Sequence, residues 1–149
     1  MRLADRFLTH YQSTYDGNAW HGLPLRTILA GIDDTKAHAR PLAAAHSIAQ
    51  LAAHLGAWIE IVERRARGEE VDVTPELDFP TVDGVAFSEI VARIERAHAS
   101  FVDTVKTIDD AGFAAIVPGK KYTHEFMLFG VVNHNAYHSA QIALLKKAI

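Results

Sequence analysis

Hydrophobic residues recur every three to four positions in four long stretches of the chain, at residues 2–15, 47–67, 87–108 and 123–148. This spacing is typical of helices with one buried face. A shorter stretch of the same kind covers residues 23–32. Runs in which apolar and polar residues alternate, as in β-strands, are scarce. The pattern therefore predicts an all-α protein with four long helices and one short one.

The predicted helices are separated by residues that favour turns. Pro24 suits the first turn of a helix, and Gly68 is a good stop after an Arg-rich helix end. Residues 74–84 and 112–121 contain prolines and indicate loops. Four helices joined by loops of mixed length predict a single four-helix bundle domain over residues 1–149.

Composition and charge exclude several functions. Fifteen Lys and Arg residues against eighteen Asp and Glu residues leave a net charge of −3, which argues against nucleic-acid binding and against a polybasic membrane anchor. No apolar run reaches the length of roughly 18 residues that a membrane span needs. The absence of cysteine excludes disulfides, thiolate nucleophiles and Cys-based metal sites. We expect a cytoplasmic protein.

The chain contains nine histidines, and neutral imidazole is the commonest metal ligand. A projection at about 100° per residue places His54 at the edge of an apolar sector, beside Leu51 and Trp58. The same projection places His46 on the opposite side. We therefore expect His54 to point into the protein and His46 to point away from it.

His134 and His138 lie near the middle of the buried side of the last predicted helix, together with Gln141. Asn135 and Ser139 fall on its polar side. Residues four apart have Cβ atoms about 5–6 Å from each other, so the two imidazoles can bind one cation. Burying them without partners would cost roughly 2 kcal/mol or more each. With His54 they form a three-histidine set like those that hold catalytic zinc.

Other polar and aromatic residues have a packing interpretation. We interpret His98 and His10 as core histidines on the inner faces of their helices. For His98, contact with a metal ligand or with a substrate stays open as an alternative. Three arginines at the end of the second long helix predict a solvated face: Arg64, Arg65 and Arg67. Three aromatic residues either pack or line a pocket: Trp20, Trp58 and Tyr122.

Two stretches of the sequence resemble DinB-like proteins. These are HSIAQLAAHLGAWIEIVERRARG at residues 46–68 and GVVNHNAYHSAQIALLKKA at residues 130–148. AWHGLPLRTILAGI, at residues 19–32, is similar to the N-terminal connector of the same group. The resemblance implies the DinB/YfiT-like superfamily, with an up-down-down-up four-helix bundle that forms a homodimer.

The resemblance also implies a divalent metal, zinc or nickel, bound by His54, His134 and His138, the three histidines that point inward. Relatives of this kind include S-transferases that use bacillithiol or mycothiol, a maleylpyruvate isomerase and metal-dependent hydrolases. The implied chemistry is activation of water or of a low-molecular-weight thiol against a small electrophile.

The general base of such a reaction is not evident, because Glu60 points away from the apolar sector and Glu63 lies far from His54. Tyr137 is a candidate donor to a developing negative charge, and Gln141 is a candidate for holding the substrate or orienting a ligand ring. Two alternatives stay open. One is a non-catalytic metal-binding or stress-related bundle, and the other is a helical dimer whose histidines are core residues.

Overall fold

The computed structural model describes residues 1–149 and consists of helices and loops, with one isolated β-bridge between Ile116 and Thr123. Four long helices form the bundle: α1 (Leu3–Asp16), α4 (Ile48–Ala66), α6 (Phe87–Lys106) and α8 (His124–Lys146). Short helices lie in the connections: α2 (Leu25–Leu29), α3 (Asp34–His38), α5 (Pro75–Asp78) and α7 (Asp110–Ala114). The prediction of an all-α bundle is confirmed, and each long helix begins and ends within two residues of its predicted bounds.

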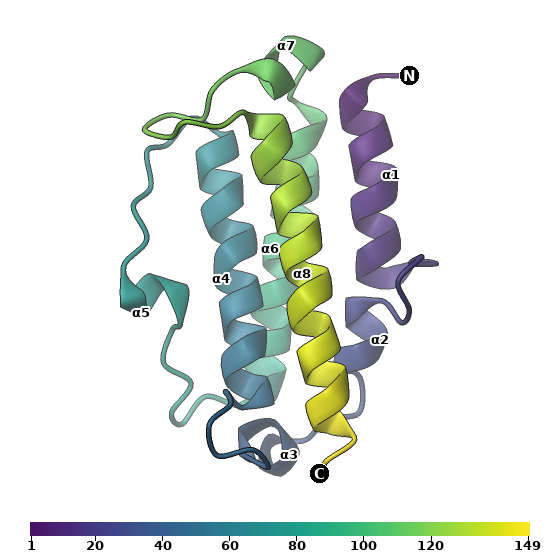
Figure 1. Cartoon of the computed structure of the whole chain (residues 1–149), viewed down its shortest axis with the longest axis vertical. Coiled ribbons are helices and arrows are strands. Elements are labelled where there is room, and N and C mark those ends of the chain that lie inside the picture. The colour runs from purple at the N-terminus through teal and green to yellow at the C-terminus, as the bar shows by residue number, and fades with distance from the viewer.

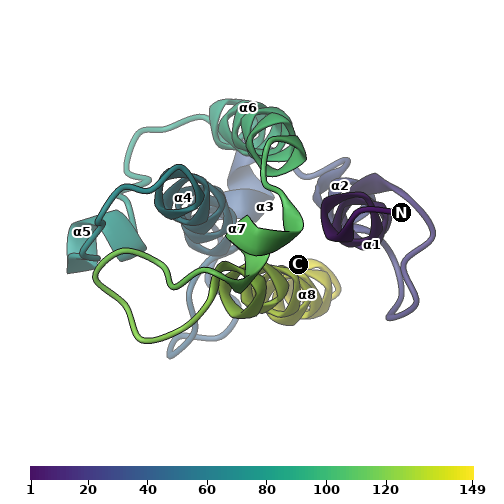
Figure 2. The ribbon, with the colours of Figure 1, turned by 90° about the horizontal axis from the view of Figure 1, so that it is seen from above.

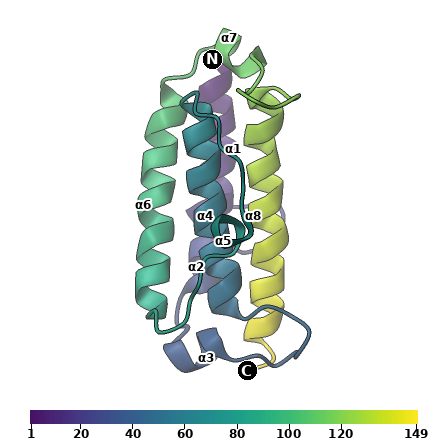
Figure 3. The same cartoon turned by 90° about the vertical axis from the view of Figure 1, so that its left-hand side faces the viewer.

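The long helices follow the expected up-down-down-up order. In Figure 1, α1 and α8 run downward while α4 and α6 run upward. Seen from above, the helices surround a common centre (Figure 2). Because α4 and α6 are parallel, their connection must return along the whole bundle, and it carries α5 past the outer side of α4 (Figure 3).

Local capping fixes where the two histidine-bearing helices begin. The Ser47 side chain accepts from the backbone N–H of Gln50, and the Gln50 side chain accepts from the backbone N–H of Ser47. This capping box satisfies two backbone donors at the start of α4. The Thr123 hydroxyl accepts from the backbone N–H of Phe126 at the start of α8. The residues that follow therefore have a defined helical register.

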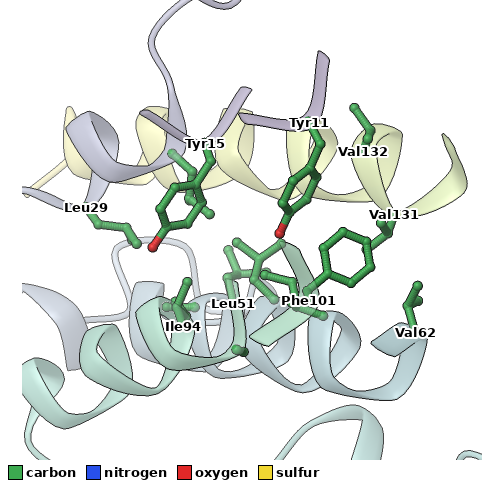
Figure 4. Close-up of a cluster of buried hydrophobic side chains, with 14 of the residues drawn as sticks. Tyr11, Tyr15, Leu29, Leu51, Val62, Ile94, Phe101, Val131 and Val132 are labelled. Atoms are coloured by element: carbon green, nitrogen blue, oxygen red, sulfur yellow. The ribbon is translucent and has the colours of Figure 1, made fainter. Parts of the chain in front are cut away.

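A single hydrophobic cluster of 33 buried residues fills the centre of the bundle. Tyr11 and Phe101 are fully buried within it, with ring centroids 4.7 Å apart (Figure 4). A Cβ atom added to Gly56 would lie 3.2 Å from the Ile94 side chain. The lack of a side chain at Gly56 thus permits the close packing of α4 against α6.

Two predicted faces were wrong. Asn135 and Ser139, predicted on a polar side of α8, are only 5% and 3% exposed. The cause is that α8 packs against α4 on one side and against α1 and α2 on another, which a single-stripe interpretation does not anticipate. His10, predicted to point inward, is exposed, because it lies roughly 100° around α1 from the centre of the buried face.

No helix in this structure combines the length and the hydrophobicity needed to cross a lipid bilayer. The longest, α8, has 23 residues, but it carries polar and titratable side chains along its length, His134 and His138 among them.

Candidate metal site

Three histidines converge between α4 and α8. His54 comes from α4, and His134 and His138 come from successive turns of α8. Each offers one ring nitrogen, and the three nitrogens lie within 4.8 Å of one another. The ring centroids are 4.5 to 4.8 Å apart. The structure therefore brings together the three histidines that the sequence singled out, in a geometry compatible with a metal ion.

His54 is held by the loop that crosses the outer side of α4. Its Nδ1 lies 2.7 Å from the carbonyl oxygen of Asp78 and 3.2 Å from the Asp78 carboxylate. Because a carbonyl oxygen only accepts, Nδ1 carries the proton, and Nε2 presents a lone pair to the other two rings. The indole N–H of Trp58 donates to the same carboxylate at 2.7 Å. Asp78 thus orients His54 through both its backbone and its side chain.

Sequence reasoning missed Asp78 because residues 74–84 read as a loop without a function. A signal was present, since Thr74 followed by Pro75 is a typical helix start. In the structure the Thr74 hydroxyl caps α5, which ends at Asp78.

His138 is oriented by its own helix. Its Nδ1 lies 2.6 Å from the side-chain oxygen of Gln141, three residues further on. The amide oxygen accepts, so Nδ1 donates and Nε2 of His138 is left with a lone pair. Gln141, considered for either substrate binding or ring orientation, here contacts the ring. In both His54 and His138 the lone pair is therefore on Nε2, and Nδ1 donates to a protein acceptor. Metal-binding histidines have the same arrangement, with one ring nitrogen on the metal and the other donating a hydrogen bond.

His134 completes the group. Its Nε2 lies 2.9 Å from Nε2 of His54, and because the latter bears a lone pair, His134 donates a proton there. The Nδ1 atom of His134 is buried without a hydrogen-bond partner, as is the side-chain oxygen of the next residue, Asn135. A cation in place of the shared proton would leave His134 protonated at Nδ1, which needs an acceptor, and Asn135 provides an unused one. The donor set therefore fits a metal ion.

Burial favours the neutral form of two of these rings, those of His134 and His54. Burial, together with repulsion from His138 and His54, lowers the pKa of His134 to about 4. Burial also lowers the pKa of His54, against the opposing effect of the Asp78 carbonyl. A neutral imidazole is the protonation state that binds a metal, so the site favours metal binding at neutral pH.

Two cavities reach this group from opposite directions along α8. A cavity of about 260 Å³ reaches His134 and is lined by the first half of α8 together with Trp58 and Tyr122. A second cavity, of about 480 Å³, reaches His138 and is lined by the second half of α8. We call them the aromatic cavity and the larger cavity. The histidine group thus lies between two separate spaces rather than in a closed core.

The larger cavity contains two residues on which the sequence left expectations. Tyr137 is 64% exposed, and its ring centroid lies 5.0 Å from that of His138. His46 is exposed, outside the histidine group as expected, but its ring stacks on Phe79 at 4.2 Å. Phe79 stacks in turn on His54 at 4.1 Å. Tyr137 and His46 therefore stand at the mouth of the larger cavity.

Residues away from the group have other partners. His98 stacks on Tyr15 with ring centroids 3.6 Å apart, which agrees with a packing role. Glu60 forms two bonds to Arg93, and buried Glu63 is bonded to Arg67, so neither carboxylate acts at the site. Trp20 is fully exposed and lines neither of these two cavities.

One arginine differs from its predicted setting. Arg65, expected on a solvated face, is only 5% exposed. Its guanidinium donates to the Val71 carbonyl and to the Tyr122 hydroxyl, because the chain after α4 folds back over it. The prediction of a solvated arginine face is therefore wrong for Arg65, while Arg64 and Arg67 are exposed.

Comparison with known families found a match that covers most of the chain. A model of the DinB superfamily matches residues 24–142, which include all of α4 and α6 and most of α8. The chain therefore belongs to the DinB superfamily. A search of curated proteins found no match.

Proposed function

We propose that the protein is a metal-dependent enzyme in which His54, His134 and His138 bind one divalent ion, zinc or nickel. The observation that carries the proposal is the convergence of three ring nitrogens within 4.8 Å. The Asp78 carbonyl and the Gln141 amide support it, because they leave the lone pairs of His54 and His138 on the edges that face the group. Imidazole suits both metals, so the ligands alone do not select between them.

A divalent ion held by three neutral ligands lowers the pKa of bound water or of a bound thiol towards neutrality. The protein's own residues supply orientation and shelter. Asp78 and Gln141 hold two of the rings in place, and apolar residues form most of the lining of both cavities. Tyr137 lines the larger cavity, and in the proposed reaction it would donate its hydroxyl proton to negative charge that develops on a substrate.

The two cavities favour transfer of a thiol over hydrolysis. Hydrolysis needs one organic reactant, whereas thiol transfer needs two. The aromatic cavity is sized for a small electrophile, and the larger cavity, which also contains polar residues such as Gln141 and His46, is sized for a thiol cosubstrate. In the proposed reaction the thiolate sulfur forms a bond to the electrophilic carbon, and the leaving group departs with the electron pair.

Metal analysis tests the proposal. Purified protein is expected to contain about one zinc or nickel ion per chain, and His134→Ala is expected to contain none. His46→Ala is the matched control, since His46 is a neighbouring exposed histidine outside the group, and it should keep the metal. Metal retained in His134→Ala, or lost in His46→Ala, would contradict the assignment.

Activity is tested with a chromogenic chloroaromatic electrophile, in the presence and absence of a low-molecular-weight thiol. We expect turnover that needs both metal and thiol, and Tyr137→Phe should reduce kcat while the metal content stays unchanged. Turnover without thiol would favour hydrolysis, and full metal content with neither activity would favour the non-catalytic alternative.

We further propose that a second copy of the chain binds the outer face of α8. Six of its exposed positions follow a spacing of alternately four and three residues, and none of the six is charged: Phe126, Gly130, Asn133, Tyr137, Ala140 and Leu144. Such a seam matches the same seam on another helix across a two-fold axis. Light scattering should give the mass of a dimer, and Ala140→Lys should give the mass of a monomer.

A further inference from the structure

The aromatic cavity contains a buried positive charge that has no anionic partner. Arg65 is 5% exposed, yet none of the ion pairs of the protein includes it. Nearby arginines differ, since Arg64 pairs with Glu69 and Arg67 pairs with Glu63. Buried charges in proteins are normally paired, because an isolated one loses its hydration without compensation.

Donors remain free around this charge. The Arg65 Nε and Nη2 atoms donate to the Val71 carbonyl at 3.2 and 2.7 Å, and Nη1 donates to the Tyr122 hydroxyl at 3.2 Å. A guanidinium has five N–H groups, so each terminal nitrogen keeps one N–H without an acceptor. The Tyr122 hydroxyl accepts from Arg65, which leaves its own proton free to donate. Arg65 and Tyr122 together therefore match the two oxygens of a carboxylate.

The rest of the lining is apolar and partly aromatic. The Arg65 guanidinium lies over the Trp58 ring, 5.9 Å from its centroid, and Val62, Phe126 and Met127 form further wall. The volume of about 260 Å³ exceeds the roughly 150 Å³ of a dry protein cavity that binds benzene. A single ring with one substituent fits such a space. His134 lies at the edge of the same cavity.

We propose that the aromatic cavity binds a small aromatic carboxylate, with its carboxylate on Arg65 and Tyr122 and its ring against Trp58. This inference rests on the proposed function for what happens to that molecule, because it names the substrate class of the same site. Binding of the carboxylate itself needs only the cavity. The substrate's opposite end then faces His134 and the histidine group.

The test uses protein freed of metal by a chelator, so that no carboxylate is held by a metal ion. Trp58 lines the cavity and Trp20 is fully exposed, so in a Trp20→Phe background Trp58 is the one tryptophan left of the two in the chain. Benzoate and benzamide are titrated separately, because they share the ring and differ in charge. We expect benzoate to quench Trp58 and to bind at least about tenfold more tightly than benzamide, as charge-assisted hydrogen bonds predict.

Variants locate the binding. Arg65→Gln is expected to weaken benzoate binding at least about tenfold while benzamide binding changes little. Tyr122→Phe removes one hydroxyl and no ring, so it tests the same cavity if Arg65→Gln does not fold, and it should weaken benzoate several-fold. Arg64→Gln is the control, since Arg64 is exposed and pairs with Glu69, and it should bind benzoate normally.

Two results would overturn the inference. One is equal affinity for benzoate and benzamide, and the other is normal benzoate affinity in Tyr122→Phe together with every folded Arg65 variant. The metal content of the same preparations before chelation reports on the proposed function independently. Benzoate binding by a protein that never contains metal would retain the cavity assignment and reject the metal enzyme. Metal in a protein that does not bind benzoate would support the metal site and reject the cavity assignment.

Discussion

His134 and His98 have similarly lowered pKa values, but their rings have different neighbours. Burial lowers the pKa of both His134 and His98 to about 4. His134 faces two other imidazoles, whereas His98 faces two tyrosine rings, stacked on Tyr15 and with Nδ1 3.3 Å from the Tyr11 hydroxyl. Burial and a lowered pKa are thus common to both, and only the convergence of ring nitrogens distinguishes the candidate metal site.

The comparison shows why a histidine on an inner helix face does not by itself indicate a ligand. The ring of His98 is stacked on Tyr15 and has Nδ1 bonded to the Tyr11 hydroxyl, and replacing it should affect stability. The Nδ1 atom of His134 is buried without a hydrogen-bond partner. If Nε2 bound a cation, Nδ1 would carry the proton and could donate it to an acceptor. The predictions below test whether this difference has the consequences we assign to it.

The largest expected effect is on metal content. His138→Ala should reduce the zinc or nickel content from about one per chain to none, because two imidazoles do not make up the three-ligand set. His98→Ala should keep the metal and instead lower the free energy of unfolding by about 2 kcal/mol, as truncation of a packed ring does. Mass spectrometry of the metals and denaturant titration measure the two effects. Loss of metal in His98→Ala would contradict the distinction between a metal ligand and a core histidine.

A smaller effect is expected from the residue that orients His138. Gln141→Ala removes the acceptor that lies 2.6 Å from Nδ1, and it should weaken zinc affinity about 10- to 100-fold. Competition with a chromogenic chelator measures the affinity. Gln141→Glu retains an acceptor at the same position and is expected to bind zinc nearly as well as the parent, so equal affinity in all three proteins would reject the orienting role.

The next prediction concerns pH and the ring of His98. Its pKa is about 4 in the folded protein against an ordinary value of 6.5, so the unfolded chain binds more protons between these values. The free energy of unfolding therefore falls as the pH drops through this window and is fully retained above it. For the metal-free protein, the loss between pH 7 and pH 5 should be about 1 kcal/mol smaller in His98→Gln, allowing for partial exposure of the ring.

Urea titrations of the two metal-free proteins at both pH values give this difference directly. An identical pH dependence in the parent and in His98→Gln would show that the ring of His98 titrates normally in the folded state. His98 would then no longer support the argument that burial lowers the pKa of His134.

The smallest expected effect comes from the hydroxyl that faces His98. Tyr11 is fully buried, and burial raises the pKa of its hydroxyl far above its ordinary value. Its bond to His98 is long, at 3.3 Å, so Tyr11→Phe should lower the free energy of unfolding by no more than about 1 kcal/mol. Metal content should not change. Thermal denaturation together with metal analysis would reveal a larger role.

Much of the fold and the three histidines could be predicted because they depend on local periodicity. The spacing of four residues between His134 and His138 and the apolar sector around His54 follow from helix geometry alone. Asn135 and Ser139 were misplaced because α8 is covered on more than one side, a property of tertiary packing. Helical periodicity alone does not show which elements cover α8.

The contacts that loop residues make could not be predicted from the sequence, for a related reason. Asp78 contacts His54 across 24 positions of sequence, and Arg65 is buried only because Val71 and Tyr122 fold over it. Neither contact follows from a helical repeat, since each depends on the path of a connection. The inward direction of the three histidines and the position of Gln141 beside His138 were therefore predictable, whereas the contacts of Asp78 and Arg65 were found only in the structure.

The most direct test of the account is X-ray absorption spectroscopy of the zinc-loaded protein. We predict three imidazole nitrogens at about 2.0–2.1 Å from the metal, together with at least one further ligand that is not histidine, such as water. His134→Ala and His138→Ala should not give this spectrum, and His98→Ala should give it unchanged. A spectrum with no imidazole scattering, or one identical in His134→Ala, would contradict the claim that these three rings form one metal site.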